Sequence, residues 1–270
     1  SKGANVNQTD QDGNTPLIIA SYHKNRKIAK YLVSEGAIIN QQNNREDSPL
    51  LIASKYGDLE LVKYFISLNA DLNQTDQFQN SPLFIAAREG HLEIVKYLVE
   101  KGANIALYND YENTPLSIAS DKGNIEIVKY LVSEGADINH PNYKNIPPIY
   151  LAWRKINFHV VEYLLSDGAK IENQINLLAA TKNEAFRIIQ LLVSKYKVNV
   201  NQCNTMGNTP LMVACELGDL KIVKFLVSKG ADINLMNMYG DTAISIAQRK
   251  EKIEIAQYLT DIEHLKHEKT

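Results

Sequence analysis

Residues 114–139 read TPLSIASDKGNIEIVKYLVSEGADIN, and this stretch returns in varied form along the chain. Its opening triplet recurs at a spacing of 33 residues, as Thr15-Pro16-Leu17, Ser48-Pro49-Leu50, Ser81-Pro82-Leu83 and Thr114-Pro115-Leu116, and again as Thr209-Pro210-Leu211 and Thr242-Ala243-Ile244. A fixed period of this length is typical of a stacked array of small supersecondary units. Such arrays act through extended surfaces, so the period favours binding over catalysis.

The first part of each period predicts a helix. In the third unit Ser81 can cap a helix whose first turn holds Pro82, where a missing N–H costs nothing, and Gly90 can end it. An alanine recurs three residues after the leucine of the triplet, because two closely packed helices leave room there for only a methyl group. These alanines are Ala20, Ala53, Ala86, Ala119, Ala152, Ala180, Ala214 and Ala247.

The second part of the period predicts another helix and a projecting connection. In residues 92–99 apolar side chains recur at intervals of three and four, and Gly102 supplies the left-handed position that ends the helix. The polar segment 103–113 is long enough for a hairpin before the next unit. The sequence therefore predicts an all-α repeat fold, an α-solenoid with β-hairpin fingers.

The period also predicts the domain organisation. We expect a single domain over residues 1–270 with eight helix-pair units, whose first helices start near residues 15, 48, 81, 114, 147, 175, 209 and 242. Residues 1–7 match residues 228–234 position for position, so we expect residues 1–14 to be the remnant of a preceding repeat in a longer protein. Residues 253–270 are expected to form a C-terminal capping helix and a polar tail.

Residues 147–200 break the regular pattern. Leu177 follows Ile149 by 28 residues instead of 33, so the connection between Gly168 and Leu177 should be nearly absent. Trp153, the only tryptophan, stands where other units carry small or polar residues. Two interpretations stay open: a decayed repeat whose packing has readjusted, or a bend or specialised pocket.

Composition limits the classes of partner. The chain is 44% hydrophobic and 22% charged, and 29 basic residues against 31 acidic ones give a net charge of -2, so nothing attracts the whole protein to nucleic acid or to a membrane. Only Cys203 and Cys215 are present, which favours a reducing compartment. We expect a cytoplasmic location, with the nucleus as the alternative.

These motifs closely resemble the ankyrin repeat family, over essentially the whole chain. The family pattern of a Thr-Pro-Leu helix start, an alanine-rich first helix and a Gly-Ala-Asp-Ile-Asn exit is matched almost fully by residues 114–139. The resemblance implies an ankyrin repeat superhelix that binds partners on a concave face. This face comprises the finger tips and the exposed side of the first helices, here called the palm.

The chain departs from the family at one position. The family usually has histidine directly after Thr-Pro-Leu, where it hydrogen-bonds between units. This chain has Ile18, Leu51, Phe84, Ser117, Tyr150, Leu178, Met212 and Ser245 there. We therefore expect a weaker polar network between repeats, with apolar packing carrying more of the stability.

The finger tips vary while their flanks repeat, as expected for a reading surface. Equivalent tip positions hold Asp12, Arg45, Phe78, Tyr111, Lys144, Met206 and Tyr239. Aromatic residues occupy adjacent fingers at Phe78, Tyr108, Tyr111 and Tyr143, and exposed aromatic side chains are common binding anchors. The alternative is that these rings only pack on neighbouring fingers.

The palm is predicted to be basic. Its exposed positions hold the cations Lys55, Arg88, Lys122, Arg154, Lys155, Lys182, Arg249 and Lys250, against the acids Glu89, Asp121 and Glu216. This pattern suggests an acidic or phosphorylated peptide along the palm, although a merely solvated helix face would look similar. The candidate protein-binding residues are Tyr22, Arg45, Tyr56, Phe78, Arg88, Tyr108, Tyr111, Lys122, Tyr143, Lys144, Arg154, Lys155, Met206 and Tyr239.

No motif in the sequence indicates catalysis. A glycine-rich phosphate loop, an HExxH motif and a nucleophile elbow are all missing, so we expect no enzyme, no catalytic residue, no cofactor and no metal site. The sequence favours a monomeric protein-interaction scaffold that binds a protein or peptide. One alternative is the targeting arm of a larger enzyme or signalling protein, such as a kinase or ubiquitin-ligase component. Nucleic-acid binding through the basic palm is a distant third, and no membrane partner is expected.

Overall fold

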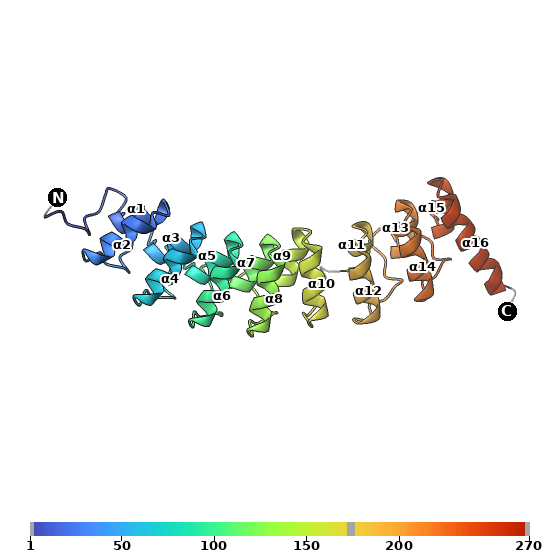
Figure 1. The fold of residues 1–270 in the computed structure, drawn as a ribbon. Coiled ribbons are helices and arrows are strands. Elements are labelled where there is room, and N and C mark those ends of the chain that lie inside the picture. Colours follow the sequence, from blue (N-terminus) through green and yellow to red (C-terminus); the bar gives the residue numbers. More distant parts are fainter. Residues whose placement is uncertain (1–2, 172–175, 268–270) are drawn as a thin grey trace. The chain divides into compact units, whose positions relative to one another are not determined.

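The computed structural model describes residues 3–171 and 176–267 of the chain. These residues form sixteen helices in consecutive pairs and no strand (Figure 1). The all-helical repeat fold is therefore confirmed. The chain divides into two compact units, Ser1–Leu164 and Leu165–Thr270. The division falls inside the segment 147–200, where the sequence loses its regular period.

The first unit contains five helix pairs, the last helix of which runs two residues past the boundary. Their bounds are α1 Pro16–Tyr22, α2 Arg26–Ser34, α3 Pro49–Tyr56, α4 Leu59–Ser67, α5 Pro82–Glu89, α6 Leu92–Glu100, α7 Pro115–Lys122, α8 Ile125–Ser133, α9 Pro148–Arg154 and α10 Phe158–Ser166. The first helices of neighbouring pairs pack on one another from α1 to α9. They make a continuous layer in this unit, with the second helices α4, α6 and α8 on one side of it (Figure 1).

The second unit contains three further pairs. Their bounds are α11 Leu177–Lys182, α12 Phe186–Ser194, α13 Pro210–Leu217, α14 Leu220–Ser228, α15 Ala243–Arg249 and α16 Ile253–His267. The cap of α11 is Asn176, whose side chain accepts from Ala179 N. Residues 172–175, which include the expected helix start near 175, and the tail residues 268–270 lie outside the described residues. No helix in the described ranges is long and apolar enough to cross a membrane.

The first helices form where the sequence places their caps. The Thr114 hydroxyl accepts from Ser117 N at 3.2 Å, Pro115 occupies the first turn, and Gly123 ends α7 in the left-handed conformation with φ 77°. The recurring alanine is fully buried in these units, as at Ala86 and Ala119. Capping and a close helix contact therefore act together in each unit.

Residues other than the family's histidine carry the polar network between repeats. The cap position of the second helix reaches back to the end of the preceding first helix: Asn124 Nδ2 donates to Ala87 O at 2.8 Å, and Asn157 Nδ2 to Ser120 O at 3.0 Å. At the same cap position in the second pair, the buried carboxylate of Asp58 pairs with Arg26, the first residue of α2, with Arg26 Nε 2.8 Å from Asp58 Oδ1. Polar contacts between repeats are thus made at this cap position by Asn124 and Asn157, which meet free carbonyls at a helix end.

The fingers are tight turns rather than the expected β-hairpins with strands. Each finger precedes a first helix, and fingers one to five comprise residues 10–14, 43–47, 76–80, 109–113 and 142–146. In finger four Asn109 N donates to Asn113 O at 3.1 Å, and neighbouring fingers share a single backbone bond, as from Tyr143 N to Tyr111 O at 3.2 Å. One bond per neighbour is too few for a strand ladder. The fingers therefore form a row of linked turns along the edge of the first-helix layer.

Within the second unit, Lys195 and Tyr196 contact backbone carbonyls at and just after the end of α10. Lys195 Nζ donates to Ser166 O at 2.7 Å, and Tyr196 Oη lies 2.9 and 2.8 Å from the carbonyl oxygens of Leu165 and Ala169. Burial raises the pKa of Tyr196. These side chains satisfy carbonyls that the helix end leaves free.

Candidate functional site

A row of asparagine side chains holds the fingers in place. In finger five Asn142 Oδ1 accepts from the backbone N–H groups of Lys144 and Ile146, each at 3.0 Å, while Asn142 Nδ2 donates to Asn113 Oδ1 in finger four at 3.2 Å. The same link between neighbouring fingers joins Asn43 to Asn14, Asn109 to Asn80 and Asn237 to Asn208. Because one amide orders its own turn and the next, the tip side chains project from fixed backbone.

The aromatic tip residues are held in place and remain exposed. Tyr111 and Tyr143 are each 51% exposed, and their ring centroids lie 5.8 Å apart. Tyr108 stacks on His140 at 5.9 Å, whereas Phe78 is 48% exposed and no ring contact is recorded for it among the described residues. Packing on the neighbouring finger and availability for binding therefore coexist in the Tyr111–Tyr143 pair.

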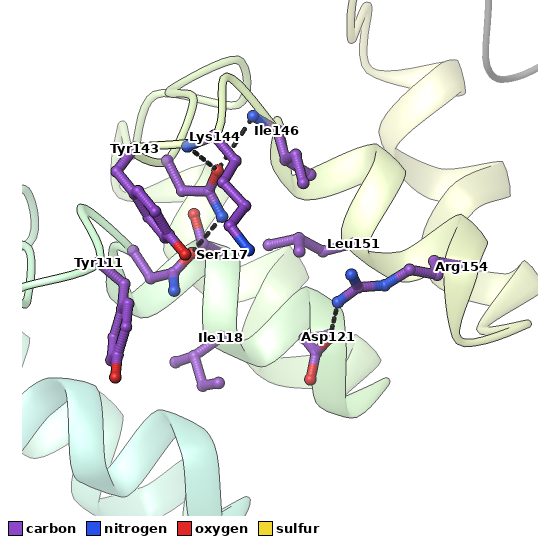
Figure 2. Close-up of a pocket in the computed structure, with 11 residues that line it drawn as sticks. Tyr111, Ser117, Ile118, Asp121, Tyr143, Lys144, Ile146, Leu151 and Arg154 are labelled. Atoms are coloured by element: carbon purple, nitrogen blue, oxygen red, sulfur yellow. Dashed lines mark hydrogen bonds and ion pairs between the residues drawn. The ribbon is translucent and has the colours of Figure 1, made fainter.

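A pocket of about 230 Å³ lies where fingers four and five meet α7 and α9. Figure 2 shows Tyr111 and Tyr143 on one side of it, and Leu151 and Arg154 on the other. Ile118, Ile146 and the buried Leu151 supply apolar wall. The pocket brings together four of the predicted binding residues, Tyr111, Tyr143, Lys144 and Arg154.

Two of the three charges that line the pocket face each other. Arg154 Nη2 lies 3.7 Å from Asp121 Oδ1, so this pair is close to neutral as seen from the pocket. The third charge, Lys144, has its Nζ 5.2 Å from the centre of the Tyr143 ring and no ion pair among the described residues. The pocket thus carries one uncompensated positive charge, held near an aromatic face.

Ion pairs reduce the basic character predicted for the palm. Arg88 pairs with Glu89 at 2.8 Å and Lys250 with Glu216 at 2.9 Å. Arg249 pairs at 2.6 Å with Asp241, a finger residue that the sequence-based count left out. Four exposed palm lysines have no ion pair within the part of the chain that the structure describes: Lys55, Lys122, Lys155 and Lys182. The unpaired positive charge of the palm is therefore smaller than predicted, and these four lysines carry it.

Tyr22 and Tyr56 form a separate cluster at the first two units. Their ring centroids lie 5.6 Å apart, and the Tyr22 hydroxyl donates to Asp47 Oδ2 at 3.3 Å. Burial, followed by the charge of Asp47, raises the pKa of Tyr22 to about 12. The Tyr22 hydroxyl is therefore already hydrogen-bonded within the protein, and Tyr56 is the more exposed of the two side chains.

The remaining candidates are not among the residues that line the pocket. Arg45 is exposed at the tip of finger two, and its carbonyl accepts from Gln77 N at 3.1 Å. Met206 and Tyr239 belong to the second unit, where their fingers are joined by a bond from Met238 N to Met206 O at 3.0 Å. Tyr239 is 67% exposed.

Sequence reasoning missed several of the residues that line the pocket. Ile118, Asn142, Ile146 and Leu151 were not among the candidates, although a signal for two of them was present. Asp or Asn recurs every 33 residues at 10, 43, 76, 109 and 142, and the position four residues later holds Asn or Asp in every earlier finger but Ile at 146.

Comparison with known proteins gives a consistent result along the chain. A family model described as ankyrin repeats matches residues 1–76, 50–142, 112–175 and 176–269. Similar proteins include the putative ankyrin repeat protein YahD of Escherichia coli (strain K12), which is 34% identical over 90 residues, covering 32% of this chain and 45% of the relative. Another is the protein fem-1 homolog A-like of Mus musculus, 32% identical over 68 residues, covering 25% of this chain and 10% of that protein.

A third relative is a putative ankyrin repeat protein of Rickettsia felis (strain ATCC VR-1525 / URRWXCal2), which is 37% identical over 59 residues. The match covers 22% of this chain and 26% of the relative. The chain thus matches less than half the length of each of these proteins.

Proposed function

The chain belongs to the ankyrin repeat family, whose repeats are generally non-catalytic protein-interaction domains, and we propose that it binds a partner protein or peptide on its finger and palm surface. The observation that carries this proposal is the Tyr111–Tyr143 pair at the mouth of the pocket. Both rings are half exposed on backbone that the asparagine row holds rigid. Rigid aromatic side chains beside a concave site offer large contact area at low entropic cost.

An acidic or phosphorylated partner is favoured by the charges that remain unpaired. Lys122 at the end of α7, Lys155 at the C-cap of α9 and Lys144 on finger five have no ion pair among the described residues. The palm arginines Arg88 and Arg154 face Glu89 and Asp121. We therefore assign long-range attraction to the lysines and a positioning role to the arginines.

The two alternative functions differ in the support they have. Because the chain matches less than half of each relative, it could act as the targeting arm of a larger protein, such as a kinase or ubiquitin-ligase component. Nucleic-acid binding is disfavoured by the net charge of -2 and by the paired palm cations. We further propose a monomer without enzymatic activity or cofactor, in the cytoplasm or nucleus, consistent with two free cysteines.

The experiment that tests this function compares variants in affinity capture from native lysate, with mass spectrometry of the bound proteins. The variants are Tyr111→Ala with Tyr143→Ala, and Lys122→Glu with Lys155→Glu. Lys63→Glu is the control, because Lys63 lies on the second helix α4 and not on the finger and palm surface. We expect both double variants to lose the same acidic partner that the wild type and the control retain. A partner captured equally by all four proteins would contradict binding on this surface.

A further inference from the structure

Finger five differs from its neighbours at the corner where it joins the palm. The corner is the last residue of each finger, and in four other fingers it is an asparagine whose Oδ1 accepts a hydrogen bond from an asparagine of the next finger. Asn80 accepts from Asn109 at 3.0 Å, and Asn113 accepts from Asn142 at 3.2 Å. Finger five has Ile146 there, followed by Pro147 in place of the usual Ser or Thr. Accordingly, α9 begins without a side-chain cap.

The polar atoms deep in the pocket already have partners. Asn142 uses its amide oxygen twice and its amide nitrogen once, and Ser117 Oγ lies 3.1 Å from Thr114 Oγ1. A polar ligand group placed there would lose water and would compete with these existing hydrogen bonds. Beside these satisfied groups stand Ile118, Ile146 and Leu151. The interior of the pocket is therefore suited to an apolar occupant.

The size of the pocket points to a side chain rather than to a free small molecule. Its volume of about 230 Å³ falls below the range of roughly 300–1,000 Å³ in which small-molecule sites usually lie. The two tyrosine rings at its mouth are half exposed, so an inserted group would also cover them. One large apolar side chain of a bound polypeptide meets both conditions.

Charge places a second requirement on the occupant. Of the charges that line the pocket, Arg154 and Asp121 face each other at 3.7 Å. No ion pair engages Lys144 within the described ranges, and its Nζ lies 5.2 Å from the centre of the Tyr143 ring. An anionic group next to the inserted side chain would be placed to form an ion pair with the Lys144 ammonium at the mouth of the pocket.

We propose that the pocket between fingers four and five is an anchor site that takes one large apolar side chain of the partner, next to an anionic residue that pairs with Lys144. The proposal rests on the function proposed above and names the chemistry that the partner must present. Ile146 determines the preference for an apolar anchor, and Lys144 the preference for its anionic neighbour.

The test selects binders from a displayed library of short random peptides, using the intact chain. Four proteins are compared: the wild type, Ile146→Asn, Lys144→Gln, and the double variant Tyr111→Ala with Tyr143→Ala. Ile146→Asn introduces the residue that four other fingers carry at this position, so the fold should be kept, and circular dichroism and thermal unfolding verify this. The enriched peptides are then synthesised, and their affinities are measured by fluorescence anisotropy.

We expect the wild type to enrich peptides in which a large apolar residue adjoins Asp, Glu or, in synthetic versions, phosphoserine. Alanine in place of the apolar residue should weaken binding about tenfold or more, as expected for a buried aliphatic group. This penalty should vanish in Ile146→Asn. Neutralising the anionic residue should weaken binding to the wild type but not to Lys144→Gln.

The outcomes separate this proposal from the broader one. Two results would overturn the anchor site but not the proposed binding surface. One is a set of peptides that depend on Tyr111 and Tyr143 but share no apolar residue. The other is a loss of affinity on alanine replacement that is as large in Ile146→Asn as in the wild type. Peptides that bind the tyrosine double variant as well as the wild type, or no enriched peptide at all, would overturn both.

Discussion

At the scale of single residues, Asp47 occupies the finger corner where Asn14, Asn80 and Asn113 stand in neighbouring fingers. It is half-buried and accepts from the Tyr22 hydroxyl at 3.3 Å. Burial raises the pKa of Asp47 above its ordinary value of 3.8, the charge of Lys55 opposes the shift, and the charge of Asp76 in the next finger adds to it. Two carboxylates thus stand near each other where the other fingers join through amides.

The raised pKa predicts how stability depends on pH. The folded protein holds the Asp47 proton more tightly than the unfolded chain does, so this group's stabilising contribution is complete below pH 3.8 and is lost as the pH rises through the folded-state pKa. Asp47→Asn should therefore raise the free energy of unfolding at pH 7 by up to about 1 kcal/mol, a figure already reduced for solvent screening. The gain should shrink as the pH approaches 3.8.

Urea unfolding of Asp47→Asn and the wild type over this pH range measures the effect. The introduced amide would still offer an acceptor to the Tyr22 hydroxyl, and Tyr22→Phe serves as the control that removes only that hydrogen bond. A gain of the same size at neutral and acidic pH would refute the assignment to ionisation.

At the scale of the element, seven finger turns in the described ranges each place one residue in the left-handed conformation. Glycine fills this position at Gly13, Gly207 and Gly240, with φ of 77–78°. The fingers between them use Glu46, Gln79, Glu112 and Asn145, with φ of 54–61°. A side chain in this region of φ costs of the order of 1 kcal/mol or more, which the surrounding hydrogen bonds must offset.

Glu46→Gly is therefore expected to raise the free energy of unfolding by about 0.5–1 kcal/mol, because glycine adopts this conformation without strain. Glu46→Ala is the matched control, since it removes the carboxylate but keeps the Cβ atom. The reverse change, Gly13→Ala, should destabilise by about 1–3 kcal/mol, because a Cβ atom at Gly13 would lie 2.8 Å from Asn44 N. Thermal and urea unfolding report all three, and equal stability of Glu46→Gly and Glu46→Ala would disprove the role of strain.

The helices and their caps could be predicted from the sequence because they depend on neighbours close in the chain. Thr114, Pro115 and Gly123 act within one turn of a helix end, so their pattern alone indicates α7. The asparagine row and the Arg249–Asp241 pair could not be predicted in the same way. They depend on how far one finger stands from the next and on which side chains meet there.

At the scale of the whole molecule, repetition explains both the stability of the fold and the position of the candidate site. Each helix pair in the first unit packs on its neighbours, and fingers one to five are joined in sequence by one backbone bond at each step and, where asparagine allows, one amide bond. The pocket lies at the finger where the corner asparagine is replaced by Ile146. Function is thus proposed where the repeat departs from its own pattern, on a framework that keeps to it.

Amide hydrogen exchange of the free and partner-bound protein tests the central claim most directly, with a peptide from the library selection as the partner. The account predicts slower exchange on binding in residues 109–113 and 142–146, whose turns carry Tyr111, Tyr143 and Lys144, and no change in the outer helix α8. Protection centred on α8, or spread evenly over all fingers, would contradict binding at the pocket between fingers four and five.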